Sequence, residues 1–265
     1  MTDFHKKPRR KQTQNKASSR AGKPADALWL YGRHAALAAL RNPERKIKRI
    51  VATRNGAEWL AERLPLQDRP GQYEDAKPHQ LEALLHDGAV HQGIALEVED
   101  LPSAQIEDIC IPADINRPIL VLDQITDPQN IGALFRTAVA FHARAIVVQE
   151  RRTPPLAGAL AKAAAGGLEV LPCIKVVNIA RALRELQDIG YLTVGLAGEI
   201  QDDIHNLPKD QPIALVMGAE GPGLRQLVRE TCERLVRISI APEIESLNVS
   251  TAAAVALYEI NRPML

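Results

Sequence analysis

Five short, continuous apolar runs in the C-terminal half of the chain constrain its fold more than any other feature. They lie at residues 118–125, 144–149, 191–198, 213–218 and 235–240, and helical patterns separate or follow them at 131–141, 156–165, 179–188, 223–229 and 248–260. Strands that are apolar along their whole length are typical of parallel sheets covered by helices on both faces. The alternation of strand and helix therefore predicts a doubly wound α/β domain over residues 117–265.

A smaller unit precedes this domain. Helical patterns at 35–40, 57–64 and 77–85 alternate with strand-like segments at 48–53 and 93–98. This alternation predicts a small α/β domain over residues 27–99. Residues 100–116 hold two prolines and several acids without clear periodicity, which indicates a linker.

Composition excludes several classes of protein. The cysteines, Cys110, Cys173 and Cys232, are widely spaced and form no CxxC pair, so we expect neither a metal site nor a disulfide framework, and a reduced, cytoplasmic setting. No apolar run approaches the roughly 18 residues that cross a bilayer, and the N-terminus lacks the apolar core of a signal peptide, so no membrane partner is expected. Aromatic residues make up only 3% of the chain, which argues against binding mainly by base stacking.

The first helix of the larger domain carries two polar candidates for chemistry. Its buried stripe consists of residues at helical spacing, namely Ile131, Leu134, Phe135, Ala138 and Val139. Arg136 points about 130° away from that stripe, at about 100° per residue, and is therefore available to a ligand. Asn130 lies in the first turn, where its amide either caps the helix or orients a substrate.

Two later strands are also followed by polar or glycine-rich segments. In ALVMGAEGPG at 214–223, Gly218 and two further glycines permit a tight bend and the close approach of a ligand, and Glu220 lies among them. The alternative is an ordinary surface turn; the pattern is not the GxGxxG of dinucleotide-binding loops. In SLNVS at 246–250, Ser246 or Asn248 either caps the last helix or belongs to a site.

These three segments, starting with LDQITDPQNIGALFRTA at 122–138, resemble motifs 1, 2 and 3 of the SpoU branch of the knotted (SPOUT) RNA 2'-O-ribose methyltransferases. LYGRHAALAAL and VHQGIALEV resemble the N-terminal, ribosomal-protein-like RNA-binding domain of the same group. The resemblance implies a deep trefoil knot, S-adenosylmethionine (SAM) as cofactor without a metal, and a homodimer. The implied substrate is RNA, with a guanosine of 23S ribosomal RNA expected. Transfer RNA, or a non-catalytic RNA-binding protein on the same fold, is the alternative.

The resemblance also implies roles for individual residues. In this family the residues that match Asn130 and Arg136 are the catalytic pair. Those that match Glu220, Ser246 and Asn248 complete the catalytic pocket. A guanidinium stays protonated to a pH above about 12, so we expect Arg136 to act through a substrate phosphate rather than as a base.

Further residues are expected to bind the cofactor or the RNA. Gly218, Ile238 and Leu247 are the expected cofactor contacts. The bend before SLNVS departs from the family's proline and glycine, because it has Ser239 and then Ala-Pro-Glu at 241–243, which leaves its path open. The turn at 165–169, AGGLE, resembles the family's SGALE-like turn without its serine and is expected to support the sheet. Polar residues of the smaller domain are weaker candidates for RNA contacts, namely Arg33, His34, His91 and Gln92.

The charge of the chain is unevenly distributed. Residues 1–26 carry eight Lys or Arg and two Asp, a net +6, whereas the rest of the chain carries 25 basic and 30 acidic residues, a net −5. A polar, basic segment with almost nothing to bury is expected to be a disordered arm. It is either a solubilising tail or a contact for RNA phosphates, whose binding would weaken as salt rises.

Overall fold

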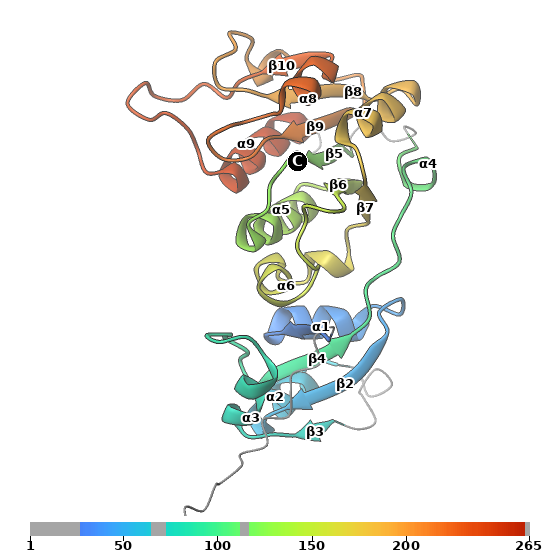
Figure 1. Cartoon of the computed structure of the whole chain (residues 1–265), viewed down its shortest axis with the longest axis vertical. Helices are drawn as coiled ribbons and strands as arrows, with labels where there is room; N and C mark the ends of the chain where they lie inside the picture. Colours follow the sequence, from blue (N-terminus) through green and yellow to red (C-terminus); the bar gives the residue numbers. More distant parts are fainter. Residues whose placement is uncertain (1–26, 65–72, 112–116, 263–265) are drawn as a thin grey trace, which may run out of the picture.

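The computed structural model describes residues 27–64, 73–111 and 117–262. The basic arm expected at 1–26 and the end of the expected linker, 112–116, lie outside the described residues. Two α/β units lie one above the other, and the segment that connects them runs along one side of the molecule (Figure 1). Within the described ranges, none of the helices has the length and hydropathy of a membrane span.

The larger unit is built on a six-stranded parallel sheet, as the apolar runs predict. In spatial order its strands are β10 (Arg234–Val236), β8 (Leu192–Leu196), β9 (Ile213–Met217), β5 (Ile119–Leu122), β6 (Ala145–Gln149) and β7 (Cys173–Val176). All five pairings between neighbouring strands are parallel. The sequence did not predict β7, because this strand lies at the sheet edge and only one of its four residues is buried.

Helices cover both faces of this sheet. One face is packed by α5 (Pro128–Ala140), α6 (Gly158–Ala164) and α9 (Val249–Asn261), and the other by α7 (Ile179–Asp188), α8 (Gln226–Thr231) and the short α4 (Ile106–Ile109). Side chains of β5 alternate between them: Leu120 and Leu122 face the first set, Ile119 and Val121 the second. Helix α4 lies inside the segment expected as a linker and is buried against the second face through Ile106.

The smaller unit has a four-stranded mixed sheet in the order β1-β4-β2-β3. Its strands are β1 (Leu28–Tyr31), β4 (Ile94–Val98), β2 (Ile47–Ala52) and β3 (Glu74–Asp75). Helices α1 (Arg33–Arg41) and α2 (Arg54–Ala61) pack on one face and α3 (Pro78–Leu84) on the other, and all three overlap the predicted helices. Strand β3, with two exposed residues, has no pattern that a sequence could reveal.

The three cysteines are free thiols, of which Cys110 is buried and the other two are partly buried. Burial raises the pKa of each thiol to about 12, for Cys110, Cys173 and Cys232 alike. Because the thiolate is the nucleophile, we expect none of them to react with iodoacetamide in the native protein at about pH 8. Mass spectrometry should find adducts only after unfolding in urea. Equal labelling rates in the native and unfolded protein would contradict this expectation.

Candidate active site

A cavity of about 350 Å³ opens where strands β8 and β9 end. Its wall is formed by Ala197 and Gly198 after β8, by Met217 at the end of β9 with residues 218–224 that follow it, and by residues 245–247 before α9. In open α/β sheets, ligands bind at the carboxyl ends of the strands. The cavity therefore lies where the parallel sheet predicts a site. The loop from β10 to α9, which supplies residues 245–247, projects from the body of the larger unit (Figure 1).

The path of the glycine-rich loop after β9 requires glycine at position 218. A Cβ at Gly218 would lie 2.3 Å from the carbonyl carbon of Gly223 and 2.5 Å from the nitrogen of Leu224. The Gly223 N–H donates to the Ala219 carbonyl at 2.9 Å, which closes a tight turn. Gly223 itself has a φ of 70°, in the left-handed region that favours glycine. The turn brings bare backbone to the cavity wall.

A buried carboxylate holds the far end of this loop. Asp123, directly after β5, is fully buried and accepts from the backbone N–H of Arg225 at 2.9 Å and from its Nε at 2.8 Å. The Nη2 atom of the same arginine lies 2.6 Å from the carboxylate. Charge-assisted bonds of this kind are roughly twice as strong as neutral ones. Asp123 was missed in the sequence; the available signal was an acid that directly follows a strand buried on both faces.

The first and third motifs meet through two asparagines. The Nδ2 atom of Asn248 donates to Oδ1 of Asn130 at 3.1 Å. Asp127, not Asn130, caps α5, because its carboxylate accepts from the Asn130 N–H at 2.8 Å. Asn248 does cap α9 by accepting from the N–H of Ser250 at 2.9 Å. Asn248 thus orients the Asn130 side chain, which has no capping role.

The other predicted site residues lie in three places. Four of them line the cavity: Gly218, Glu220, Ser246 and Leu247. Arg136 is exposed on α5, as its helical phase predicts, but lines a different hollow, together with His34 and Ala38 of the smaller unit. Ile238 packs, half-buried, against the core of the larger unit. A single copy of the chain therefore assembles the cavity and the asparagine pair but leaves Arg136 apart from the cavity.

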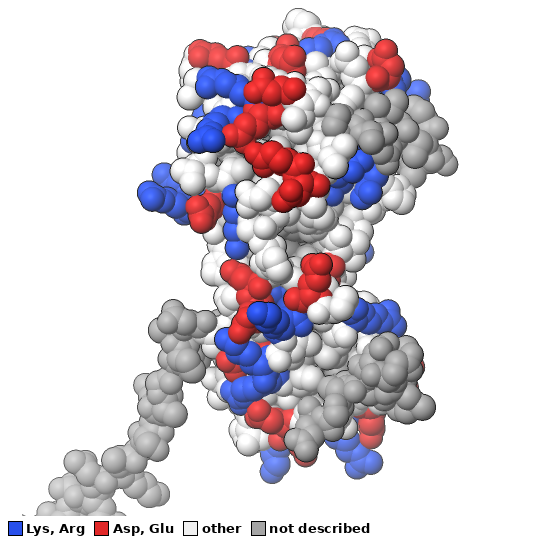
Figure 2. Space-filling model, turned by 90° about the vertical axis from the view of Figure 1, so that its right-hand side faces the viewer, with Lys and Arg blue, Asp and Glu red and all other residues white. Residues whose placement is uncertain are grey.

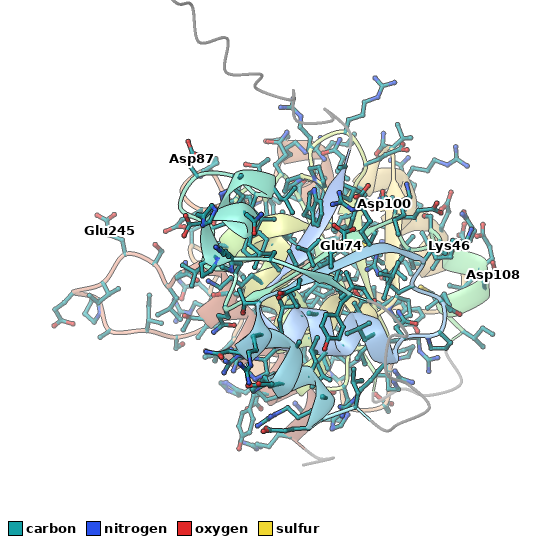
Figure 3. All side chains as sticks on the ribbon, turned by 90° about the horizontal axis from the view of Figure 1, so that it is seen from below. Lys46, Glu74, Asp87, Asp100, Asp108 and Glu245 are labelled. Carbon is teal, nitrogen blue, oxygen red and sulfur yellow. The ribbon has the colours of Figure 1, made fainter. Side chains whose placement is uncertain are left out.

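The bend before SLNVS, whose sequence departs from the family pattern, is hydrogen-bonded to the rest of the larger unit at its first residues. The Ser239 hydroxyl donates to Asp203 at 2.5 Å, and this bond is the main reason why the pKa of Asp203 lies below its usual range. The Arg237 N–H donates to the Asp202 carbonyl at 2.8 Å. This irregular pairing ends β10 at Val236, so the predicted strand to residue 240 was wrong at its C-terminal end. Residues 239–246 are exposed, and Figure 3 shows Glu245 on a loop that stands away from the body.

Both units of the chain match known protein families. Residues 117–258 match the SpoU rRNA Methylase family, and residues 29–104 match the domain described as RNA 2'-O ribose methyltransferase substrate binding. Two similar proteins, both named 23S rRNA (guanosine-2'-O-)-methyltransferase RlmB, come from Vibrio parahaemolyticus and Pseudomonas putida. The first is 41% identical and covers 89% of this chain and 97% of its own length; the second is 36% identical and covers 88% and 95%.

Solved structures share the fold over both units. An rRNA methyltransferase from Sinorhizobium meliloti superposes with a TM-score of 0.74 at 24% identity and covers 90% of this chain and 88% of its own. The SpoU methyltransferase AviRb from Streptomyces viridochromogenes, in complex with the cofactor AdoMet, gives a TM-score of 0.74 at 23% identity, with 89% and 90% covered. The fold, the order of the three motifs and the extent of these matches place the chain in one family: it belongs to the SpoU rRNA methylases.

Proposed function

We propose that the chain transfers a methyl group from SAM to the ribose 2'-hydroxyl of a guanosine in 23S ribosomal RNA. The observation that carries this proposal is the hydrogen bond between Asn130 and Asn248, which joins the first motif to the third, next to Leu247 and Val249 of the cavity wall. The names of the RlmB relatives, which align with nearly the whole chain, support 23S rRNA as the substrate.

The cavity at the ends of β8 and β9 fits SAM. Its volume of about 350 Å³ lies within the range of ligand pockets, about 300–1,000 Å³. The close packing at Gly218 leaves backbone, rather than a side chain, at the wall. Glu220 and Ser246 supply polar groups, the backbone of Leu247 is proposed to meet the adenosine, and Ile238 is proposed to hold the bend beside it. Among the described residues, no cluster of three His, Cys, Asp or Glu could hold a metal ion.

The chemistry asks the protein mainly to align a weak nucleophile. SAM supplies a methyl group on a sulfonium, which is already a good leaving group. We assign to Asn130, oriented by Asn248, the placement of the ribose, which contributes through proximity. Arg136 binds a phosphate of the target nucleotide and so organises removal of the hydroxyl proton, since the guanidinium itself keeps its own proton.

A second copy of the chain would complete the site. Exposed apolar side chains lie on the loop before α9 and on α9 itself, namely Ile240, Ile244, Val255 and Tyr258, which are between 38% and 55% exposed. Apolar surface of this kind, next to a site, is typical of an interface. We propose a homodimer in which Arg136 of one copy approaches the cavity of the other. Family membership also supports a deep trefoil knot between the second and third motifs and a ribosomal-protein-like, RNA-binding role for the smaller unit.

Cations at the junction of the two units support an RNA contact there. The Arg33 Nε atom is buried without a hydrogen-bond partner in the described structure, and its guanidinium lies 5.4 Å from the ring centre of Trp59. Arg63 lies 4.4 Å from the same ring, and His34 meets it edge-on with ring centres 6.2 Å apart. Because His34 also lines the hollow of Arg136, this basic surface continues to the larger unit, which carries the proposed catalysis and is called the catalytic unit below. We propose that RNA phosphates follow it.

The surface charge of another face of the molecule is consistent with this path. On the side that carries the connecting segment, acidic side chains form a band across the larger unit (Figure 2). A polyanion such as RNA is repelled from such a band. RNA should therefore approach the larger unit from a different side.

Arg33→Ala should weaken RNA binding. It should also reduce the slope of log K against log salt by the amount that about one phosphate contact contributes. The matched control is Arg54→Ala, which removes an exposed arginine that already pairs with Glu58 at 3.0 Å. Fluorescence anisotropy with a 23S rRNA fragment, from about 50 to 200 mM salt, measures the slope of log K against log salt. Identical slopes for the wild type and both variants would show that Arg33 does not contact phosphate.

The proposed function is tested by mapping 2'-O-methylated nucleotides in ribosomal and transfer RNA from cells with and without the gene. We expect one guanosine of 23S rRNA to lose its methyl group in the deletion strain and to regain it when purified protein and SAM are added. Loss at a tRNA position would favour the tRNA alternative. An unchanged map, together with no binding of SAM in calorimetry, would favour a non-catalytic RNA-binding protein.

A further inference from the structure

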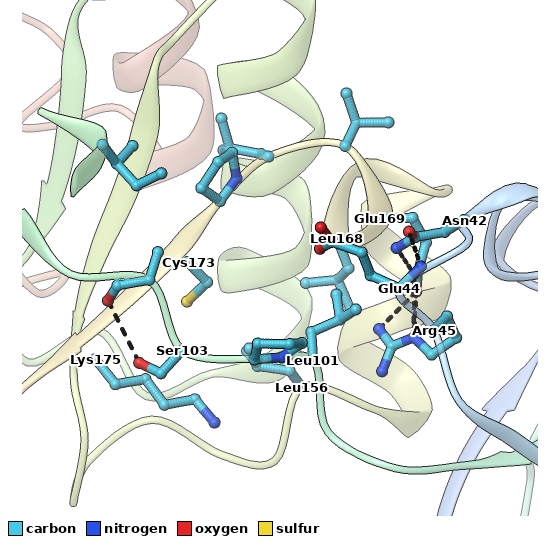
Figure 4. A pocket seen from close by; sticks show the side chains of 16 residues that line it. Asn42, Glu44, Arg45, Leu101, Ser103, Leu156, Leu168, Glu169, Cys173 and Lys175 are labelled. Atoms are coloured by element: carbon cyan, nitrogen blue, oxygen red, sulfur yellow. Dashed lines mark hydrogen bonds and ion pairs between the residues drawn. The ribbon is translucent and has the colours of Figure 1, made fainter. Parts of the chain in front are cut away.

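A buried ionic cluster fastens the smaller unit to the catalytic unit. The carboxylate of Glu169, which ends the short helix η2 (Gly167–Glu169), accepts from Nη2 and Nε of Arg45 at 2.6 and 3.0 Å. It also accepts from Nδ2 of Asn42 at 2.9 Å, while Nη1 of Arg45 donates to the Glu99 carbonyl at 2.8 Å. Figure 4 shows the cluster beside a cavity of about 300 Å³ that both units line.

The cluster is sealed from water. The side chains of Arg45 and Glu169 are only 2% and 3% exposed, unlike the surface ion pairs of this chain, such as Arg49 with Glu74. Replacing a buried ion pair by apolar residues is often neutral or stabilising, so such a pair is weak evidence for stability. Its strict geometry instead permits one relative placement of the two partners. The cluster is thus suited to fixing an orientation.

The turn that carries Glu169 packs tightly against the smaller unit. Ala165 and Gly166, with φ of 50° and 98°, are both left-handed and reverse the chain after α6. A Cβ at Gly166 would lie 2.8 Å from the Cβ of Ala38 in α1. The turn and the carboxylate therefore contact the same helix and the loop that follows it.

The same turn also packs against the backbone beside the proposed catalytic arginine. A Cβ at Gly167 would lie 3.2 Å from the carbonyl carbon and oxygen of Phe135 and 3.3 Å from the nitrogen of Arg136. The turn therefore packs between α1 of the smaller unit and α5 of the catalytic unit and contacts both. A shift of the smaller unit would be transmitted to the segment that carries Arg136.

We infer that Glu169 is a positioning residue, which fixes the RNA-binding unit relative to Arg136 through the turn at 165–169. This inference rests on the proposed function. RNA held by the smaller unit must present its ribose to the site in a near-attack geometry, and a displacement of about 1 Å can cost on the order of 10²-fold in rate. The hydrogen-bonded carboxylate of Glu169 at the junction holds the two units in one relative position. A purely apolar contact has no directional bonds and would allow the units to slide.

The test compares the double variant Arg45→Met with Glu169→Met against wild type. We expect it to bind SAM and a 23S rRNA fragment as wild type does, but to lose at least about tenfold in kcat at saturating RNA. Glu169→Gln, which keeps an acceptor for Asn42 and Arg45, should retain an intermediate kcat. The matched control, Arg181→Met with Glu185→Met, removes an ion pair within α7 that lies 2.8 Å apart and should leave kcat unchanged.

A merely structural role would lower thermal stability without this split between kcat and RNA affinity. Wild-type kcat in the Arg45 and Glu169 double variant would overturn the inference. Distances between spin labels on the two units test it without turnover: we expect a shifted or broader distance distribution for the double variant, and an unchanged distribution would also overturn it. If wild-type protein itself methylates no RNA, the proposed function fails, and the distance measurement still decides whether Glu169 fixes the two units.

Discussion

Arg136→Ala is expected to lower the rate of methyl transfer by about 10²-fold or more while the affinity for SAM stays unchanged. Losses of about this size follow when a group that holds the nucleophile in place is removed, since a misplacement of about 1 Å can cost on the order of 10²-fold. Affinity should not change, because Arg136 is proposed to bind a phosphate of the RNA rather than SAM, and within one copy it is exposed on α5 outside the cavity. Single-turnover kinetics with methyl-labelled SAM measure the rate, and calorimetry measures the affinity.

Two variants serve as controls for this result. Arg136→Lys keeps the positive charge but loses the planar fork that grips a phosphate, so a large residual defect is expected. Arg184→Ala removes another exposed arginine, on α7, and should not affect the rate.

Mixing the Arg136→Ala protein with the Ser246→Ala protein should restore part of the activity if each site takes Arg136 from one copy and Ser246 from the other. Intact turnover with lost SAM affinity in Arg136→Ala would contradict the role given to this arginine.

The sheet of the larger unit could be predicted because burial on both faces leaves a continuous apolar run. Residues 119–122 and 213–217 show it clearly, since every residue of β5 and β9 is buried. Strand β7 shows no such run at the sheet edge and was missed. The sequence also overextended β10, because apolar residues continue beyond Val236 into a loop held by Asp202 and Asp203.

The candidate site could be predicted in part. The residue pattern alone made Asn130, Glu220, Ser246 and Asn248 candidates, each with a structural alternative, and the resemblance to the three SpoU motifs assigned them to the site. No sequence signal showed that Arg136 lies apart from the cavity. The helical phase gives the direction of its side chain relative to the buried stripe of its own helix, but not the surface that the side chain faces. The partnership of Arg45 with Glu169 joins residues 124 positions apart, and an ionic pair leaves no periodic pattern.

Gly218→Ala is expected to reduce SAM affinity at least about tenfold and to destabilise the fold by about 1–3 kcal/mol, the usual cost of overpacking. The added methyl group would lie 2.3 Å from the carbonyl carbon of Gly223 and 2.5 Å from its oxygen. Both neighbours are backbone atoms, so the strain cannot be relieved by rotating a side chain. The loop must move, and with it the wall of the cavity and Glu220. Calorimetry with SAM and thermal unfolding measure the two effects.

Gly198→Ala is the matched control, because it adds the same methyl group to the same cavity wall. Apart from residue 198 and its two chain neighbours, no atom of the described structure lies within 4 Å of the new Cβ, so the loop after β9 is left in place. We therefore expect a smaller loss of affinity and little change in stability. If Gly198→Ala weakens SAM binding as much as Gly218→Ala does, a methyl group in the cavity is sufficient to explain both results. The close approach of residue 218 to residues 223 and 224 would then not be what shapes the cofactor site.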